Sequence, residues 1–100
     1  MKTGIEQITE QRNDQLKRLG YDLKHDIELN NHFQLSEAAG TLTWLDKEDY
    51  GYNIEATCPV GWNEDLWHKM MTKPYRERLA IAGALLAAEI DRLQAIMFDD

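Results

Sequence analysis

Residues 74–98 carry one long helical pattern whose middle is apolar on nearly every side. The pattern starts at Pro74, which fits the first turn of a helix, and it fills a large part of a chain of only 100 residues. A helix that is apolar all round has to be covered by other protein surface. Either the rest of the chain covers it or a second copy of the chain does.

Two apolar stripes can be followed along this helix. One includes Leu79, Leu86 and Leu93, and the other includes Ile81 and Leu85, so we expect both faces to be covered. Small residues spaced along the same helix allow a neighbouring backbone to approach closely. If the chain is an oligomer, we expect the interface between subunits to be formed by Ala80, Gly83, Ala84 and Ala87. The alternative is that the helix is the centre of a monomeric bundle.

Three shorter helices are expected before it. Residues 5–19 carry a modest apolar stripe, and residues 32–48 repeat apolar side chains at helical spacing. Residues 64–71 follow Asn63, a favourable N-cap residue. Residues 49–63 contain glycine and proline and show no helical period, so we expect them to form a long irregular loop.

Residues 21–33, between the first two helices, are dominated by polar side chains. We interpret them as a connector with room for a turn of helix, and we interpret Asn31 and Gln34 as a pair that caps the following helix. Together these patterns predict an all-α fold. It is a single small domain of three to four helices, with a long C-terminal helix over residues 74–98 and one long irregular loop.

The charge and cysteine content argue against several classes of protein. The formal net charge is −7 and the Lys and Arg residues are scattered, which disfavours nucleic-acid binding through a basic footprint. The single Cys58 cannot form an internal disulfide and has no neighbours at metal-binding spacing. The start of the chain lacks the apolar core of a signal peptide, and no apolar run is long enough to span a membrane. We therefore expect a soluble, cytoplasmic protein without membrane contact.

Four sequence blocks resemble those of a group of small phage and prophage proteins. The blocks are residues 20–26, with a Gly-Tyr and a His-Asp pair, residues 35–39, the Trp-rich residues 62–69, and residues 78–93. Their order and spacing agree over roughly residues 12–94, and the closing Ala-Gly-Ala-Leu and Ala-Glu-Ile-Asp-Arg-Leu segments are the most specific. The resemblance implies a phage accessory gene whose product acts in the cytoplasm of a bacterial host cell. It does not imply a particular reaction.

The polar connector contains the side chains best suited to metal binding. His25, Asp26, Glu28 and His32 lie within eight residues, and a set of two histidines and a carboxylate can bind a divalent metal if the side chains converge. Such spacing is also common in ordinary polar connectors. We predict neither a metal nor a cofactor.

No set of catalytic residues is recognisable. Neither Ser36 nor Cys58 lies in a sequence context typical of an enzyme nucleophile, and the paired acidic motifs of helical nucleotide hydrolases are missing. We therefore predict a protein that is not an enzyme, with a metal-dependent nucleotide hydrolase as the less favoured alternative.

Aromatic side chains gather around the connector and the expected loop, where their faces can stack on a base or on side chains of a partner. Basic residues at the start of the last helix can pair with phosphate or with acidic groups. The alternative is that the tryptophans belong to the core. The predicted ligand-binding or partner-binding residues are Tyr21, His25, Asp26, Tyr50, Tyr52, Trp62, Trp67 and Arg76.

Two classes of function follow. The favoured one is a non-enzymatic phage accessory protein that acts by binding, either by inhibiting a component of a host defence or by sequestering a nucleotide-like signal. Its partner would be a host or phage protein or a small nucleotide-like ligand. The alternative is a structural or assembly module that forms a homo-oligomer and binds no ligand. A polar, aromatic-lined pocket would favour the first class, and an exposed apolar stripe would favour the second.

Overall fold

The computed structural model describes residues 1–17, 22–44 and 54–97. Within these ranges the chain forms five α-helices, one short 3-10 helix and no strand. The elements in chain order are α1 (Gly4–Lys17), α2 (Leu23–Leu29), α3 (Gln34–Trp44), η1 (Ile54–Thr57), α4 (Glu64–Met71) and α5 (Tyr75–Met97). The predicted all-α fold with a long C-terminal helix is therefore confirmed.

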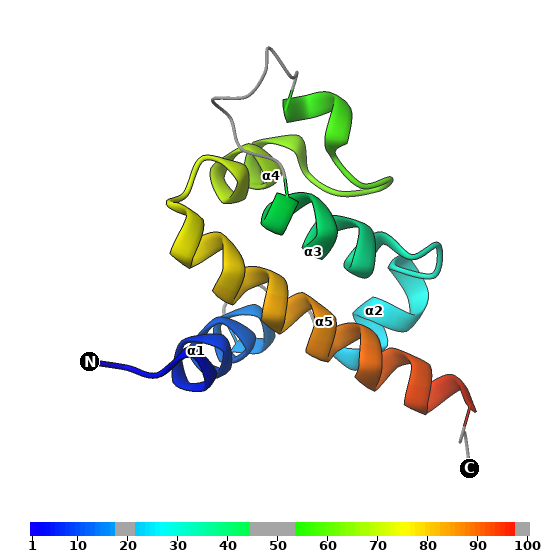
Figure 1. Cartoon of the computed structure of the whole chain (residues 1–100). Coiled ribbons are helices and arrows are strands. Elements are labelled where there is room, and N and C mark those ends of the chain that lie inside the picture. The colour runs from blue at the N-terminus through cyan, green and yellow to red at the C-terminus, as the bar shows by residue number, and fades with distance from the viewer. Residues whose placement is uncertain (18–21, 45–53, 98–100) are drawn as a thin grey trace.

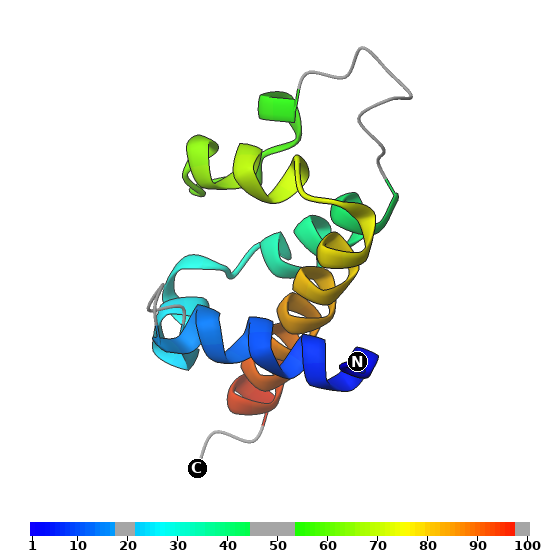
Figure 2. The same cartoon turned by 90° about the vertical axis from the view of Figure 1, so that its left-hand side faces the viewer.

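The long helix α5 runs through the middle of the molecule (Figure 1). Helix α3 packs along one side of α5, and α1 packs against the other side, with α2 beside the C-terminal half of α5 (Figures 1 and 2). Helix α4 and η1 contact each other and lie at the end where α5 begins. Since each of the other four α-helices contacts α5, this helix organises the fold.

The polar connector predicted for residues 21–33 contains a defined helix, α2. Asp22 is its N-cap, and the Asp22 side chain accepts a hydrogen bond from the backbone N–H of His25 at 2.9 Å. At the other end, the backbone N–H of Asn30 donates to the carbonyl of Asp26. The sequence pattern predicted only a turn of helix here, because α2 is defined by its capping residues and not by an apolar stripe.

The first helix and α3 have slightly different limits from those predicted. The helix predicted over residues 5–19 begins one residue earlier, and α3 begins at Gln34, two residues later than predicted. Residues 45–48 of that prediction lie outside the described ranges. The predicted capping pair is wrong: Oε1 of Gln34 accepts from the backbone N–H of His32, two residues back, instead of pairing with Asn31.

Part of the predicted irregular loop is helical. Residues 54–57 form η1, and residues 49–53 lie outside the described ranges. The indole N–H of Trp67 donates to the carbonyl of Ile54 and to the hydroxyl of Thr57, at 3.2 and 3.0 Å. These two hydrogen bonds hold η1 against α4.

The main core lies between α3, α4 and α5. Small residues on α3 and α5, such as Ala38 and Ala88, allow the two helices to approach closely. Trp67 of α4 is fully buried within the same core. The buried cluster consists of Leu35, Ala38, Ala39, Leu42, Trp67, Met70, Met71, Ile81, Ala82, Leu85 and Ala88.

Three of the four small residues predicted for a subunit interface, Ala80, Gly83 and Ala84, lie against other parts of the same chain. Ala80 and Ala84 are buried, and Ala87 is partly buried. A Cβ atom added to Gly83 would lie 2.7 Å from Cδ1 of Ile8, so α1 makes a close approach to α5 at this glycine. Ala80, Gly83 and Ala84 therefore serve the packing of α5 within this chain.

Among the residues that the structure describes, only one of the two apolar faces of α5 is buried. The face that contains Ile81 and Leu85 is buried, whereas the large side chains of the second face are between 40% and 70% exposed. Although α5 is long, no helix in the described ranges is long and apolar enough to cross a membrane. We call the exposed set the α5 stripe; it consists of Leu79, Leu86, Ile90, Leu93 and Met97.

The buried charged side chains of α5 have partners. Glu89 and Arg92, one turn apart, form a buried ion pair. Arg78 is also buried, and its Nη1 donates to the carbonyl of Leu42 at 3.3 Å. This carbonyl lies in the last turn of α3, where helix carbonyls lack partners within the helix. Pairing of this kind is what allows charges to remain in a small core.

Leu85 and Leu86 are a matched pair for testing the assignment of a buried and an exposed apolar face to α5. Leu85 is 2% exposed and Leu86 is 46% exposed. We expect Leu85→Ala to lower the free energy of unfolding by about 2–5 kcal/mol, because it leaves a cavity in the core. We expect Leu86→Ala to lower it by less than about 1 kcal/mol at low protein concentration. Urea denaturation measures both effects, and equal losses would contradict the assignment of the buried face.

Candidate functional site

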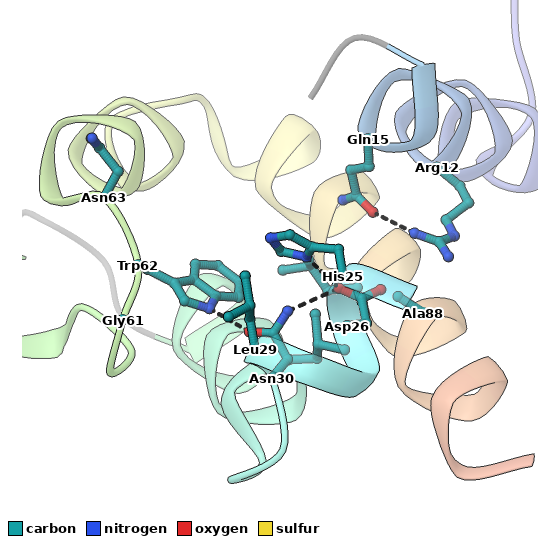
Figure 3. A pocket seen from close by; sticks show the side chains of 12 residues that line it. Arg12, Gln15, His25, Asp26, Leu29, Asn30, Gly61, Trp62, Asn63 and Ala88 are labelled. Carbon is teal, nitrogen blue, oxygen red and sulfur yellow. Dashed lines mark hydrogen bonds and ion pairs between the residues drawn. The ribbon is translucent and has the colours of Figure 1, made fainter. Parts of the chain in front are cut away.

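A cavity of about 250 Å³ lies between α1, α2, α3, α5 and the turn before α4 (Figure 3). Most of its wall is apolar and comes from Leu29, Leu35, Trp62, Leu85 and Ala88, with Gly61 beside them. An apolar cavity with a few converging polar groups is the usual form of a small-molecule site. The polar side chains that line it are Arg12, Gln15, His25, Asp26, Asn30 and Asn63.

The short helix α2 positions the central polar groups. Its N-cap, Asp22, fixes the first turn, in which His25 and Asp26 lie. Asn30 follows Asp26 by four residues, and side chains at this spacing meet on one face of a helix. Nδ2 of Asn30 donates to Oδ1 of Asp26 at 2.8 Å, and Nδ1 of His25 lies 3.2 Å from the same oxygen. Both neighbours therefore hold the carboxyl group of Asp26 in one orientation.

A hydrogen bond between Trp62 and Asn30 ties α2 to the turn before α4. The indole N–H of Trp62 donates to Oδ1 of Asn30 at 2.7 Å. Because an indole N–H can only donate, the Asn30 atom that it meets is the amide oxygen, and the amide NH₂ group faces Asp26. The donors therefore run in one direction, from Trp62 through Asn30 to Asp26 (Figure 3).

The position of Trp62 is set by a turn on one side and a helix cap on the other. Its backbone N–H donates to the carbonyl of Pro59 at 3.1 Å, and Gly61 between them has a φ of 84°, a conformation that favours glycine. Asn63, the next residue, caps α4 with its side chain. The Trp62 ring also packs edge-on against the buried Trp67 ring, with 5.9 Å between the ring centroids.

Asp26 is the most deeply buried polar residue of the site, with 1% of its surface exposed. Burial raises the pKa of its carboxyl group, and the hydrogen bonds from His25 and Asn30 and the charge of Arg12 oppose that rise. Its second oxygen, Oδ2, has no hydrogen-bond partner among the described residues. A buried acceptor without a partner destabilises the fold unless a bound molecule satisfies it.

Helix α1 contributes Arg12 and Gln15, which extend toward the cavity from the side opposite Trp62 (Figure 3). Nη1 of Arg12 donates to Oε1 of Gln15 at 3.4 Å, and Nη2 of Arg12 lies 3.6 Å from the carboxylate of Asp91. Sequence reasoning did not propose either residue for the site. The available signal was that Arg12 interrupts the apolar stripe of the first helix.

The structure brings three of the predicted site residues together, since His25, Asp26 and Trp62 all line the cavity. Trp67 belongs to the core, and its indole N–H is used by η1, so the core alternative holds for this tryptophan. Arg76 is exposed at the start of α5 and is not part of the cavity lining.

Asn30 was also missed from the sequence, although it connects Trp62 to Asp26. The signal that could have revealed it is its spacing of four residues from Asp26, which becomes informative once α2 is recognised as a helix. The remaining predicted site residues lie outside the described ranges; they are Tyr21, Tyr50 and Tyr52.

His32 and Glu28 do not join His25 and Asp26 in one cluster. Both side chains are exposed, and Nδ1 of His32 pairs with the side-chain oxygen of Asn31. In residues 1–17, 22–44 and 54–97, no three His, Cys, Asp or Glu side chains come close enough to hold a metal ion.

The lining can form hydrogen bonds and stack on a flat ring. In the tautomer in which Nδ1 of His25 donates to Asp26, Nε2 of the ring carries no proton. The described lining residues include no Ser, Thr, Cys or Lys that could act as a nucleophile. Cys58 is not among them, and burial raises the pKa of its thiol, which therefore stays protonated near neutral pH.

Comparison with known proteins adds no assignment, because no protein-family model, no curated protein and no solved structure matches this chain significantly. The functional argument therefore depends on the chemistry of the cavity and of the surface.

The raised pKa of Asp26 predicts a pH-dependent contribution to stability. Because the folded state favours the protonated carboxyl, this contribution is fully present below the unfolded pKa and is lost as the pH rises through the folded pKa. We expect the wild type to gain stability relative to Asp26→Asn as the pH is lowered from neutral into the acidic range, since Asn does not titrate. Urea denaturation of both proteins across that range measures the difference, and a difference that is independent of pH would contradict the raised pKa.

Proposed function

We propose that this chain is a non-enzymatic phage accessory protein that acts by binding, and that it binds through the cavity beside α2. The observation that carries the proposal is Oδ2 of Asp26, a buried acceptor that is held in place and lacks a partner among the described residues. A bound molecule that donates a hydrogen bond to this atom would offset the cost of burying it.

The lining supports a small ligand as the first choice. Its apolar wall and converging polar groups suit a ring with polar edges, as in a nucleotide-like signal that the protein would sequester. The same cavity could receive one side chain of a host defence protein, which the chain would then inhibit. The phage origin in this proposal rests on the sequence resemblance, whose blocks at residues 20–26 and 62–69 contribute His25, Asp26 and Trp62.

Native mass spectrometry of protein purified from bacterial cells tests the binding function. We expect the wild type to carry an associated mass, either a small molecule or a host protein, and we expect Asp26→Asn to lose it because Oδ2 is replaced. Asp65→Asn is the matched control, since Asp65 is exposed on α4 away from the cavity lining.

Loss of the associated mass from Asp26→Asn alone would support the cavity as the binding site. Wild-type protein without any associated mass, or a mass that Asp26→Asn retains while it stays folded, would count against the proposal.

A second candidate function, a homo-oligomeric assembly module, is favoured by the α5 stripe. Leu86, Ile90, Leu93 and Met97 follow one another at spacings of four, three and four residues, and Leu79 lies seven residues before Leu86. This is the heptad spacing at which two helices pack side by side. The partner for this candidate is a second copy of the chain.

The surroundings of the α5 stripe suit a second copy. Glu89 flanks the stripe but is paired with Arg92, and the other positions that flank it from Leu86 to Met97 are uncharged: Ala82, Ala87, Gln94 and Ile96. Two stripes could therefore meet without facing like charges. Such a stripe offers on the order of several hundred Å² on each copy, near the lower limit for a stable dimer. The net charge of −7 on each copy opposes association, so we expect a weak dimer that salt strengthens.

Sedimentation velocity over a range of protein concentrations tests this candidate. We expect the wild type to form dimers as concentration and salt rise, and we expect Ile90→Glu to remain monomeric because it places a charge in the α5 stripe. Ile5→Glu is the matched control, since Ile5 is exposed on α1 outside the stripe. A wild type that stays monomeric at every concentration, or dimers that Ile90→Glu leaves intact, would exclude the stripe as a dimer interface.

A further inference from the structure

We infer that the cavity takes the N–H edge of a flat, amino-substituted heterocyclic ring, such as a nucleobase, with the amino group at Oδ2 of Asp26 and the ring beside Trp62. This inference rests on the proposed binding function and adds the chemical class of the ligand.

The hydrogen bonds around Asp26 determine which kind of partner its second oxygen needs. Oδ1 receives the amide NH₂ of Asn30, and Nδ1 of His25 is within bonding distance of the same atom. At a pH above the raised pKa of Asp26 the carboxyl is ionised, and Oδ2 can then only accept a hydrogen bond. The group that enters the cavity therefore has to present a donor, and an N–H group on a ring edge meets that requirement.

The orientation of Asn30 maintains the preference of the Asp26 carboxyl for a ligand that donates a hydrogen bond. Its amide oxygen is fixed by the indole N–H of Trp62, so the Asn30 side chain cannot rotate to offer its oxygen to Asp26 without losing that bond. Trp62 is in turn held between the Gly61 turn and the Asn63 cap. These contacts fix the orientation of the Asn30 amide before any ligand arrives, which lowers the entropy lost on binding.

The size of the cavity indicates how much of the ligand it encloses. Its volume of about 250 Å³ is below the roughly 300–1,000 Å³ typical of sites for drug-sized ligands. The cavity therefore suits one ring system, with any sugar attached to that ring left outside. Leu85, Ala88 and Trp62 provide apolar surface for the faces of the ring, and Asp26 lines the same cavity.

The charges near the cavity disfavour a phosphate group in the position of the ring. The carboxyl of Asp26 would face it, and Arg12, the cation in the lining, already contacts Gln15 and Asp91. The chain as a whole carries a net charge of −7. A phosphate-bearing ligand would therefore enter base first.

Isothermal titration calorimetry with matched nucleosides tests the inference. The pairs are adenosine with purine riboside and guanosine with inosine, because the members of each pair differ in one exocyclic amino group. We expect at least one amino-bearing nucleoside to bind, and its partner without the amino group to bind about 10- to 100-fold more weakly, as the loss of a hydrogen bond to a charged group predicts.

The Asp26→Asn variant provides the second arm. It should lose the preference for the amino-bearing nucleoside, while the indole N–H resonance of Trp62 in the ¹H–¹⁵N spectrum should keep its wild-type position and so report an intact site. Trp62→Phe removes the hydrogen bond to Asn30 but retains an aromatic ring, and we expect it to weaken binding of the amino-bearing nucleoside.

Equal affinity for the two members of both pairs, or an amino preference that survives Asp26→Asn with the Trp62 resonance unchanged, would overturn the inference. The inference would also be overturned if methylguanidinium bound and no nucleoside did, because the hydrogen-bond donor that Asp26 prefers would then be a cation and not a neutral ring. If no nucleoside binds while native mass spectrometry still shows a mass that depends on Asp26, the ligand class is wrong and the proposed binding function remains.

Discussion

The close packing of α5 against its own neighbours is the constraint on which the rest of the fold depends. Ala84 is fully buried, and Gly83 leaves just enough room for Ile8 of α1. A larger side chain at either position would separate α5 from the helices beside it. Because α1, α2 and α3 each contact α5, this separation would also widen the space between them. The cavity exists because three short helices are fixed on one long one.

Within that framework, the site is held by polar contacts that span long distances in the sequence. Trp62 and Asn30 are 32 residues apart, and their hydrogen bond connects the turn before α4 to α2. The hydrogen-bond partners of Asp26 belong to α2 itself, and the N-cap Asp22 stabilises this short helix. A helix as short as α2 has little stability of its own. Its orientation therefore comes from its caps, from α5 and from the bond to Trp62.

The sequence predicts the helices that have a clear apolar period and predicts poorly what depends on tertiary contacts. Helix α5 and helix α4 were expected close to their observed limits, because periodic apolar residues and the Asn63 cap are local signals. Helix α2 was underestimated, since Asp22 and Asn30 define it through side-chain and backbone hydrogen bonds. His25, Asp26 and Trp62 were expected in the site from their residue types. Arg12, Gln15 and Asn30 were not, because their roles depend on which helices meet.

Ligand binding in the cavity, as proposed, would affect how long the protein persists in a cell. Its walls come from α1, α2, α3, α5 and the turn before α4, so a ligand can recognise it only in the folded chain. At a ligand concentration 100 times its dissociation constant, such binding adds about 2.7 kcal/mol to the free energy of unfolding. This is a large fraction of the roughly 5–15 kcal/mol that stabilises a small domain. Proteases act on the transiently open chain, so occupied molecules would outlast empty ones, and the abundance of the protein would follow the supply of its ligand.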